Sequence, residues 1–123
     1  MNKRTAKLHP VTFKHIEEEV RRLKDTKKEI LDIKEKIDGI TDREQSTVVM
    51  TKRLRNLEEI VQAIESAYQE LPCDYQNVIK DRYWRRNKLT WDGVAQRNNM
   101  HRNTAQKYKN EFIKSVAEKI GWR

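Results

Sequence analysis

The sequence predicts an all-α protein, in which an N-terminal antiparallel helical hairpin of the coiled-coil kind is followed by a C-terminal helix-turn-helix. Only three glycines and two prolines occur in 123 residues, so few residues interrupt helices. Charged residues make up 37% of the chain, so few apolar residues remain to be buried and we expect a thin core. Apolar residues recur at spacings of three and four along most of the chain, as they do in amphipathic helices.

The first helix of the hairpin is expected over residues 12–38. Thr12 is a suitable N-cap, and Gly39 is a suitable C-terminal stop. The apolar positions follow a coiled-coil-like spacing that Lys27 interrupts, and they are Phe13, Ile16, Val20, Leu23, Ile30, Ile33 and Ile37. The pattern therefore predicts one long amphipathic helix.

The second helix, expected over 47–71, has the most regular pattern in the chain. Its apolar residues alternate at spacings of four and three, and they are Met50, Leu54, Leu57, Val61, Ile64, Tyr68 and Leu71. Two such helices joined by a short connection fold back on each other. Each apolar stripe is narrow, so the hairpin needs another surface, either the C-terminal module or a second subunit. We favour packing within the chain together with self-association over packing within the chain alone, and a dimer is the favoured homo-oligomer.

Pro72 separates this first domain, residues 1–71, from a second domain of residues 72–123. Helices are expected over 72–85, 90–97 and 101–120. Thr90 is the predicted N-cap of the middle helix, and Asn98-Asn99 the tight turn that follows it, since Asn tolerates left-handed backbone. Met100 should plug the space between the last two helices, and a stripe from Ala105 to Ile120 should face the core. The aromatic residues Trp84 and Trp91 are expected to pack rather than to stack on bases.

Charge is distributed unevenly between the two predicted domains. The whole chain has a net charge of +8. Residues 1–71 contain 15 Lys and Arg and 14 Asp and Glu, a net charge of +1, whereas residues 72–123 contain 12 and 5, a net charge of +7. A basic surface confined to the helix-turn-helix half indicates a polyanionic partner, and double-stranded DNA fits best.

The exposed face of the last helix suggests how that DNA would be read. Arg can donate twice to guanine, and Asn or Gln can pair twice with adenine in the major groove. The predicted base-reading residues lie in the first two turns of the helix, off its apolar stripe: Arg102, Asn103, Gln106 and Lys107. A solvated helix face is the alternative interpretation. The residues expected to contact phosphates are Arg85, Arg86, Lys88, Thr90, Trp91, His101, Thr104 and Lys109.

The C-terminal half resembles region 4 of sigma-70-type factors. The resemblance rests on Leu71-Pro72, Val78-Ile79, Arg82-Tyr83, Leu89-Thr90, Val94-Ala95 and the run from Met100 to Thr104. The plan of the whole chain is similar to that of phage late-transcription activators of the RinA and ArpU type. Three residues depart from the pattern: Asn98 stands where an apolar residue is usual, Asn99 where Gly is usual, and His101 where a Ser cap is usual.

This resemblance implies a phage or prophage late-gene activator that works with host RNA polymerase in the bacterial cytoplasm, associated with the nucleoid. The residues themselves imply only DNA binding. A small-terminase-like subunit that recognises DNA for packaging is the alternative, and an adaptor for acidic proteins is a third interpretation. We expect no enzyme activity, no cofactor, no metal site and no membrane partner, because no suitable motif or apolar span occurs. Cys73, the single cysteine, excludes an internal disulfide.

Overall fold

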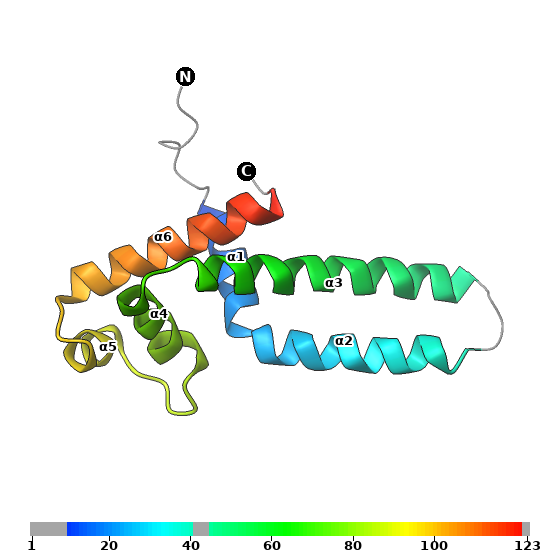
Figure 1. Cartoon of the computed structure of the whole chain (residues 1–123), viewed down its shortest axis with the longest axis horizontal. Coiled ribbons are helices and arrows are strands. Elements are labelled where there is room, and N and C mark those ends of the chain that lie inside the picture. The colour runs from blue at the N-terminus through cyan, green and yellow to red at the C-terminus, as the bar shows by residue number, and fades with distance from the viewer. Residues whose placement is uncertain (1–9, 41–44, 122–123) are drawn as a thin grey trace, which may run out of the picture.

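A computed structural model describes residues 10–40 and 45–121, which are helical throughout apart from short connections and contain no strand. The prediction of an all-α chain is confirmed. The elements, shown in Figure 1, are α1 (Pro10–Arg21), α2 (Leu23–Asp38), α3 (Gln45–Gln69), α4 (Cys73–Ile79), a π-helical segment η2 (Lys80–Trp84), α5 (Trp91–Arg97) and α6 (Arg102–Ile120). Within these residues no helix combines the length and the apolar character needed to cross a bilayer.

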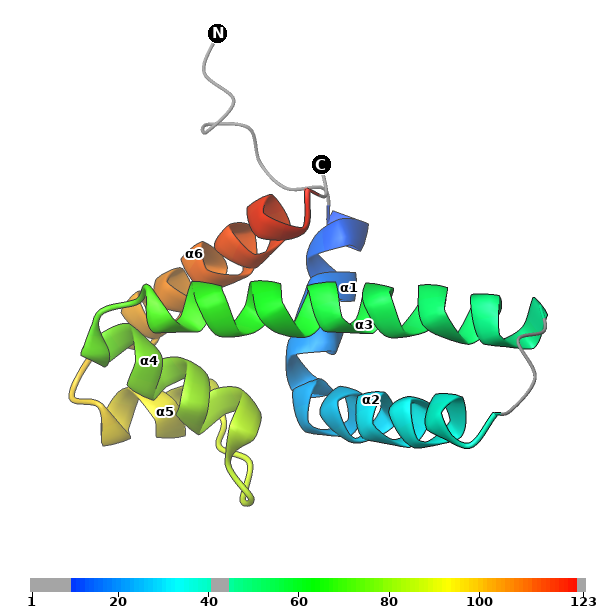
Figure 2. The ribbon, with the colours of Figure 1, turned by 45° about the vertical axis from the view of Figure 1, so that its right-hand side comes forward.

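The prediction of one continuous helix over 12–38 is wrong, because the helix breaks at Arg22. Arg22 has φ −89° and ψ 9°, and α1 and α2 turn sharply away from each other at this point (Figure 2). The break leaves the Val20 carbonyl without the N–H of the next turn. The indole Nε1–H of Trp84 donates to that carbonyl at 2.9 Å and so satisfies it.

Helices α2 and α3 lie side by side and run in opposite directions, and they project beyond the rest of the molecule (Figures 1 and 2). Their shared core is small, with Ile30, Ile33 and Leu57 each 8% exposed. Ion pairs join the two helices along their length: Lys27 with Glu65, Lys34 with Glu58 at 3.4 Å, and Arg53 with Glu29 at 2.6 Å. Such half-exposed pairs contribute little stability each, so this arm is held mainly by its thin apolar seam.

The larger core forms where α1, α3, α4, η2 and α6 meet. Its fully buried side chains include Ile16, Ile64, Ile79, Phe112 and Ile113. Trp84 packs against it with edge contacts to Tyr68 and Phe112, at centroid distances of 5.0 and 6.4 Å, so the predicted packing role of this tryptophan is confirmed. This core draws residues from both sides of residue 71, and the division into two domains there stays a prediction.

Candidate nucleic-acid interface

The turn between α5 and α6 has the features expected from the sequence. The Thr90 hydroxyl accepts a hydrogen bond of 3.1 Å from the Gly93 N–H, so Thr90 caps α5. Asn99 adopts left-handed backbone with φ 54°, the only non-glycine residue with positive φ in the described ranges. The Met100 N–H then donates to the Ala95 carbonyl at 3.0 Å and closes the turn before α6 begins.

A second, smaller core holds α5 against α6. Val78, Val94, Ala95 and Ala105 form it, with Met100 and Tyr108 packed around them. Ala95 is 5% exposed and Ala105 is fully buried. Because both are alanines, their side chains are too short to hold the two helices apart. These two alanines therefore allow α5 and α6 to pack closely, and this packing holds the N-terminal half of α6 in place.

A buried carboxylate, which sequence reasoning missed, ties this turn to η2. The Asp81 side chain is only 10% exposed. Its Oδ2 accepts a hydrogen bond of 3.0 Å from the Asn98 amide and lies 3.3 Å from Nε of Arg97, while Oδ1 lies 3.6 Å from Nη1 of Arg85. The sequence contains little signal for this cluster, because only Arg85 is near in sequence, and Arg97 and Asn98 are 16 and 17 residues away.

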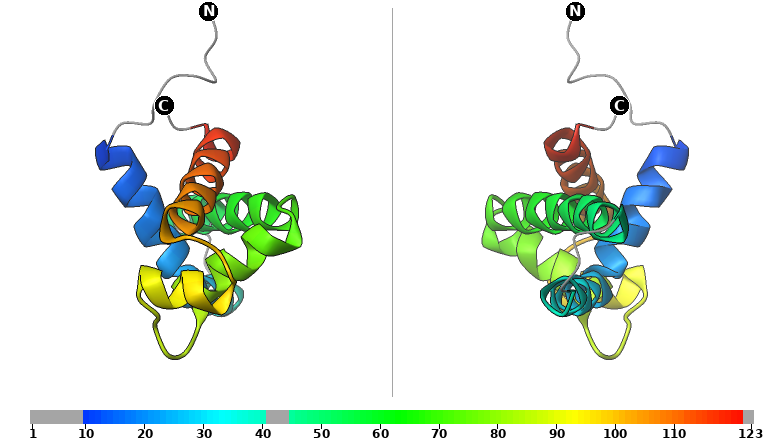
Figure 3. Two further views of the ribbon diagram at one scale, coloured as in Figure 1. Left: turned by 90° about the vertical axis from the view of Figure 1, so that its left-hand side faces the viewer. Right: turned by 90° about the vertical axis from the view of Figure 1, so that its right-hand side faces the viewer.

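The two halves of α6 differ in exposure. The C-terminal half is anchored in the larger core by Phe112, Ile113, Val116 and Ala117. In the N-terminal half, the side chains of Arg102, Asn103 and Lys107 are exposed, and that of Gln106 is half-buried. Figure 3 shows this end of α6 above α5, at the side of the molecule away from the projecting α2–α3 arm. The structure thus brings the four predicted base-reading residues onto one end of one helix.

The guanidinium of Arg102 has an acidic neighbour in α5. Its Nη1 lies 3.9 Å from Oδ1 of Asp92, and both side chains are largely exposed, at 56% and 79%. A pair this long and this exposed is weak, because water screens it. Arg102 is therefore free to exchange Asp92 for another acceptor at little cost.

Three of the residues predicted to contact phosphates, Arg85, Arg86 and Lys88, lie in the connection between η2 and α5. This connection lies apart from α6. The connection runs along the lower edge of the molecule in Figure 1, whereas α6 runs along the upper edge, and Figure 3 agrees. The Arg85 guanidinium is already engaged by Asp81, while Arg86 and Lys88 are exposed. The structure does not bring these three cations together with the base-reading residues.

Trp91 of α5 and Lys109 of α6 pack against each other and against side chains of η2 and α1. The Trp91 ring has the Arg82 guanidinium at 4.7 Å and the Lys109 ammonium at 5.4 Å from its centroid. Lys109 also lies 5.0 Å from the Phe13 ring and 4.0 Å from Glu17, and only 16% of its side chain is exposed. Burial lowers the pKa of Lys109, although the Glu17 carboxylate opposes this shift. Trp91 packs as predicted, and Lys109 is better placed for packing than for a phosphate contact.

The remaining predicted phosphate residues lie at helix N-termini. Thr90 precedes α5 and is exposed, and His101 precedes α6, is exposed and makes no side-chain cap. Thr104, in the first turn of α6, is half-buried. Helix N-termini favour anions because their first N–H groups have no partner within the helix. In residues 10–40 and 45–121, no three His, Cys, Asp or Glu side chains gather as they would around a metal ion.

Comparison with known proteins assigns the chain to a sequence family. The sequence model of one protein family, described as "Protein of unknown function (DUF722)", matches residues 9–118, which include every helix from α1 to α5 and nearly all of α6. No curated protein and no solved structure matches the chain.

Proposed function

The chain belongs to the DUF722 family, and we propose that it is a sequence-specific DNA-binding regulator of transcription. In this proposal α5 and α6 form a helix-turn-helix like that of sigma region 4, and the N-terminal half of α6 enters the major groove. The observation that carries the proposal is the grouping of Arg102, Asn103, Gln106 and Lys107 in the N-terminal half of α6, outside both buried cores.

The chemistry of these side chains suits base edges. The Arg102 guanidinium can donate two hydrogen bonds to O6 and N7 of a guanine once it leaves Asp92. Asn103 and Gln106 carry amides that can pair with N6 and N7 of an adenine. Lys107 serves either a base or a phosphate. The N-termini of α5 and α6, with Thr90, His101 and Thr104, are suited to phosphates on either side.

The charge of the chain supports the same partner. Residues 72–123 carry a net charge of +7, and an excess of this size on 52 residues attracts a polyanion without regard to sequence. The base-reading residues would then add selectivity to that general attraction. The resemblance to phage late activators suggests where such a protein acts: at a promoter, with host RNA polymerase, with the α2–α3 arm available for self-association or for the polymerase.

Selection from a pool of duplexes with a randomised centre tests the proposal. We expect the full chain to enrich one short motif after a few rounds, and the enriched duplex to bind at least a hundredfold more tightly than a scrambled duplex of equal composition. Recovery of unrelated sequences in independent selections would contradict the proposal. The mass of the complex adds a second test, because a dimer agrees with a regulator, whereas a ring of eight or more chains would indicate a DNA-packaging subunit instead.

A further inference from the structure

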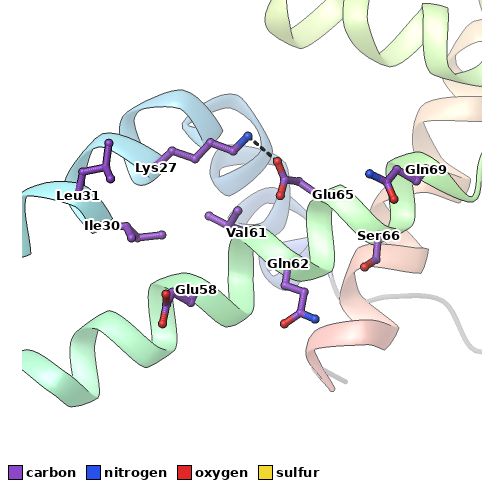
Figure 4. Close-up of a pocket in the computed structure, with 9 residues that line it drawn as sticks. All are labelled: Lys27, Ile30, Leu31, Glu58, Val61, Gln62, Glu65, Ser66 and Gln69. Carbon is purple, nitrogen blue, oxygen red and sulfur yellow. Dashed lines mark ion pairs between the residues drawn. The ribbon is translucent and has the colours of Figure 1, made fainter. Parts of the chain in front are cut away.

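One side of the α2–α3 arm carries an open groove that the proposed DNA-reading surface does not use. Figure 4 shows Ile30 and Val61 pointing toward each other across its floor, from α2 and α3. Leu31 stands beside them on α2. The groove has a volume of about 590 Å³, far more than one side chain fills. Its lining residues come from the N-terminal part of α2 and the C-terminal half of α3, so it lies at the base of the arm.

The apolar residues of this groove are covered incompletely. Leu31 is 64% exposed, in the middle of an amphipathic helix. Ile30 keeps 8% of its surface exposed and Val61 is half-buried, whereas the central residues of the larger core are fully buried. A large exposed apolar side chain next to an open apolar floor indicates a surface that a partner covers.

The charges at the rim of the groove indicate which partner. On the α2 side Lys27 lines the groove, and on the α3 side Glu58 and Glu65 line it. Lys34 follows Lys27 two turns along α2 and pairs with Glu58. All four side chains are between 44% and 51% exposed, so each has room for a second contact. One edge of the groove is therefore basic and the other acidic. A second copy that lays its α2 over α3 of the first would place lysines opposite glutamates along both edges, as a self-complementary interface requires.

We propose that the groove face of α2 and α3 is a homodimer interface, in which two copies pack face to face as a four-helix bundle. Leu31 of each copy enters the groove of the other and packs over Val61. The four lysines and four glutamates of the two copies fix the alignment. Reversing one copy would place α2 over α2 and bring like charges together, and sliding by one helical turn would move each lysine away from its glutamate. This inference deepens the oligomeric part of the proposed function, since a dimer would present two copies of α6 to a DNA site with two halves.

Leu31→Lys tests the apolar part of the interface, with Val49→Lys as its matched control. Both positions are exposed, at 64% and 66%, so neither substitution disturbs the core, and circular dichroism with thermal melting checks this. Val49 does not line the groove. Sedimentation equilibrium of the full chain without DNA should give a dimer for the wild type and for Val49→Lys. For Leu31→Lys the dimer dissociation constant should rise about tenfold or more.

Charge reversal separates contacts between copies from the ion pairs already present within one chain. One variant carries Lys27→Glu and Lys34→Glu, and a second carries Glu58→Lys and Glu65→Lys. Each alone would bring like charges together in the dimer and should sediment as a monomer. Mixed in equal amounts, the two should form a heterodimer, because α2 of each variant then meets α3 of opposite charge. Ion pairs that act only within one chain are not restored by mixing.

A monomeric wild type at 100 µM or more would overturn the proposal, and so would a ring. A wild-type dimer that survives Leu31→Lys, or a mixture of the charge variants that stays monomeric, would overturn it equally. All these measurements are made without DNA, so their failure leaves the proposed DNA reading untouched. Failure of the duplex selection would in turn leave the dimer result standing.

Discussion

The side-chain amide of Asn98 donates a hydrogen bond of 3.0 Å to the buried carboxylate of Asp81. The same amide donates to the Val94 carbonyl at 2.9 Å, within the last turn of α5. Asn98 thereby joins the end of α5 to η2, at a position where the sigma-like pattern usually has an apolar residue. A polar residue at this position is accommodated because Asp81 supplies its acceptor.

Asp81→Ala should lower the free energy of unfolding by about 1–3 kcal/mol, because it leaves the Asn98 amide and the Arg97 guanidinium without their buried acceptor. Urea unfolding at neutral pH measures the change. Asp92→Ala is the matched control, since Asp92 is 79% exposed and its removal should change stability by no more than about 0.5 kcal/mol. Equal effects of the two substitutions would show that the Asp81 contacts contribute no stability.

Asn99 offers a test of the turn itself. Asn99→Gly should leave stability unchanged or raise it slightly, because glycine adopts the observed φ of 54° without steric cost. Asn99→Val should lower stability by about 1–2 kcal/mol, since a β-branched residue is disfavoured in left-handed backbone. Thermal melting of both variants decides the matter, and a Val variant as stable as the Gly variant would exclude this backbone conformation.

Most helices of the fold could be predicted from the sequence, because their signals are local. The spacing from Met50 to Leu71 predicted a helix over 47–71, and α3 spans Gln45–Gln69. The break at Arg22 could not be predicted in this way. No Pro or Gly occurs near it, and the group that satisfies the freed carbonyl, Nε1 of Trp84, is 64 residues away in the sequence.

The candidate site was predictable to a similar degree. The periodicity of α6 separated Arg102, Asn103 and Lys107 from the buried stripe, and their exposure agrees. Periodicity could not show that Lys109 is covered, because the covering side chains of Phe13 and Glu17 come from α1, which the sequence assigned to the hairpin. It also could not show that the connection carrying Arg86 lies on the opposite side from α6.

Tyr83 predicts how stability depends on alkaline pH. Burial, together with the hydrogen bond of 2.6 Å that its hydroxyl donates to Glu17, raises the pKa of Tyr83 well above the ordinary value of 10.0. The folded state therefore keeps a proton that the unfolded state loses, and stability should fall as the pH rises above about 10. Urea titrations between pH 8 and 11 should show a shallower fall for Tyr83→Phe than for Tyr108→Phe. Parallel curves for the two variants would contradict this role of Tyr83.

DNA affinity should fall steeply with salt, because Lys and Arg displace condensed cations from phosphates. Between about 50 and 200 mM salt, we expect a loss on the order of a hundredfold or more if several phosphates are contacted. Fluorescence anisotropy with a labelled duplex measures this dependence. A flat response would exclude DNA as the partner.

The most direct test of the proposed function compares Arg102→Ala and Gln106→Ala with Arg55→Ala, on the selected duplex and on a scrambled one. Neither α6 residue is buried in the core, so all three variants should keep the wild-type circular dichroism spectrum. Arg102→Ala and Gln106→Ala should each weaken binding to the selected duplex by about 1–3 kcal/mol and reduce discrimination against the scrambled one. Arg55→Ala, which removes the same charge from α3 as Arg102→Ala removes from α6, should keep full discrimination. If both α6 variants discriminate between the two duplexes as well as the wild type does, α6 does not read DNA sequence.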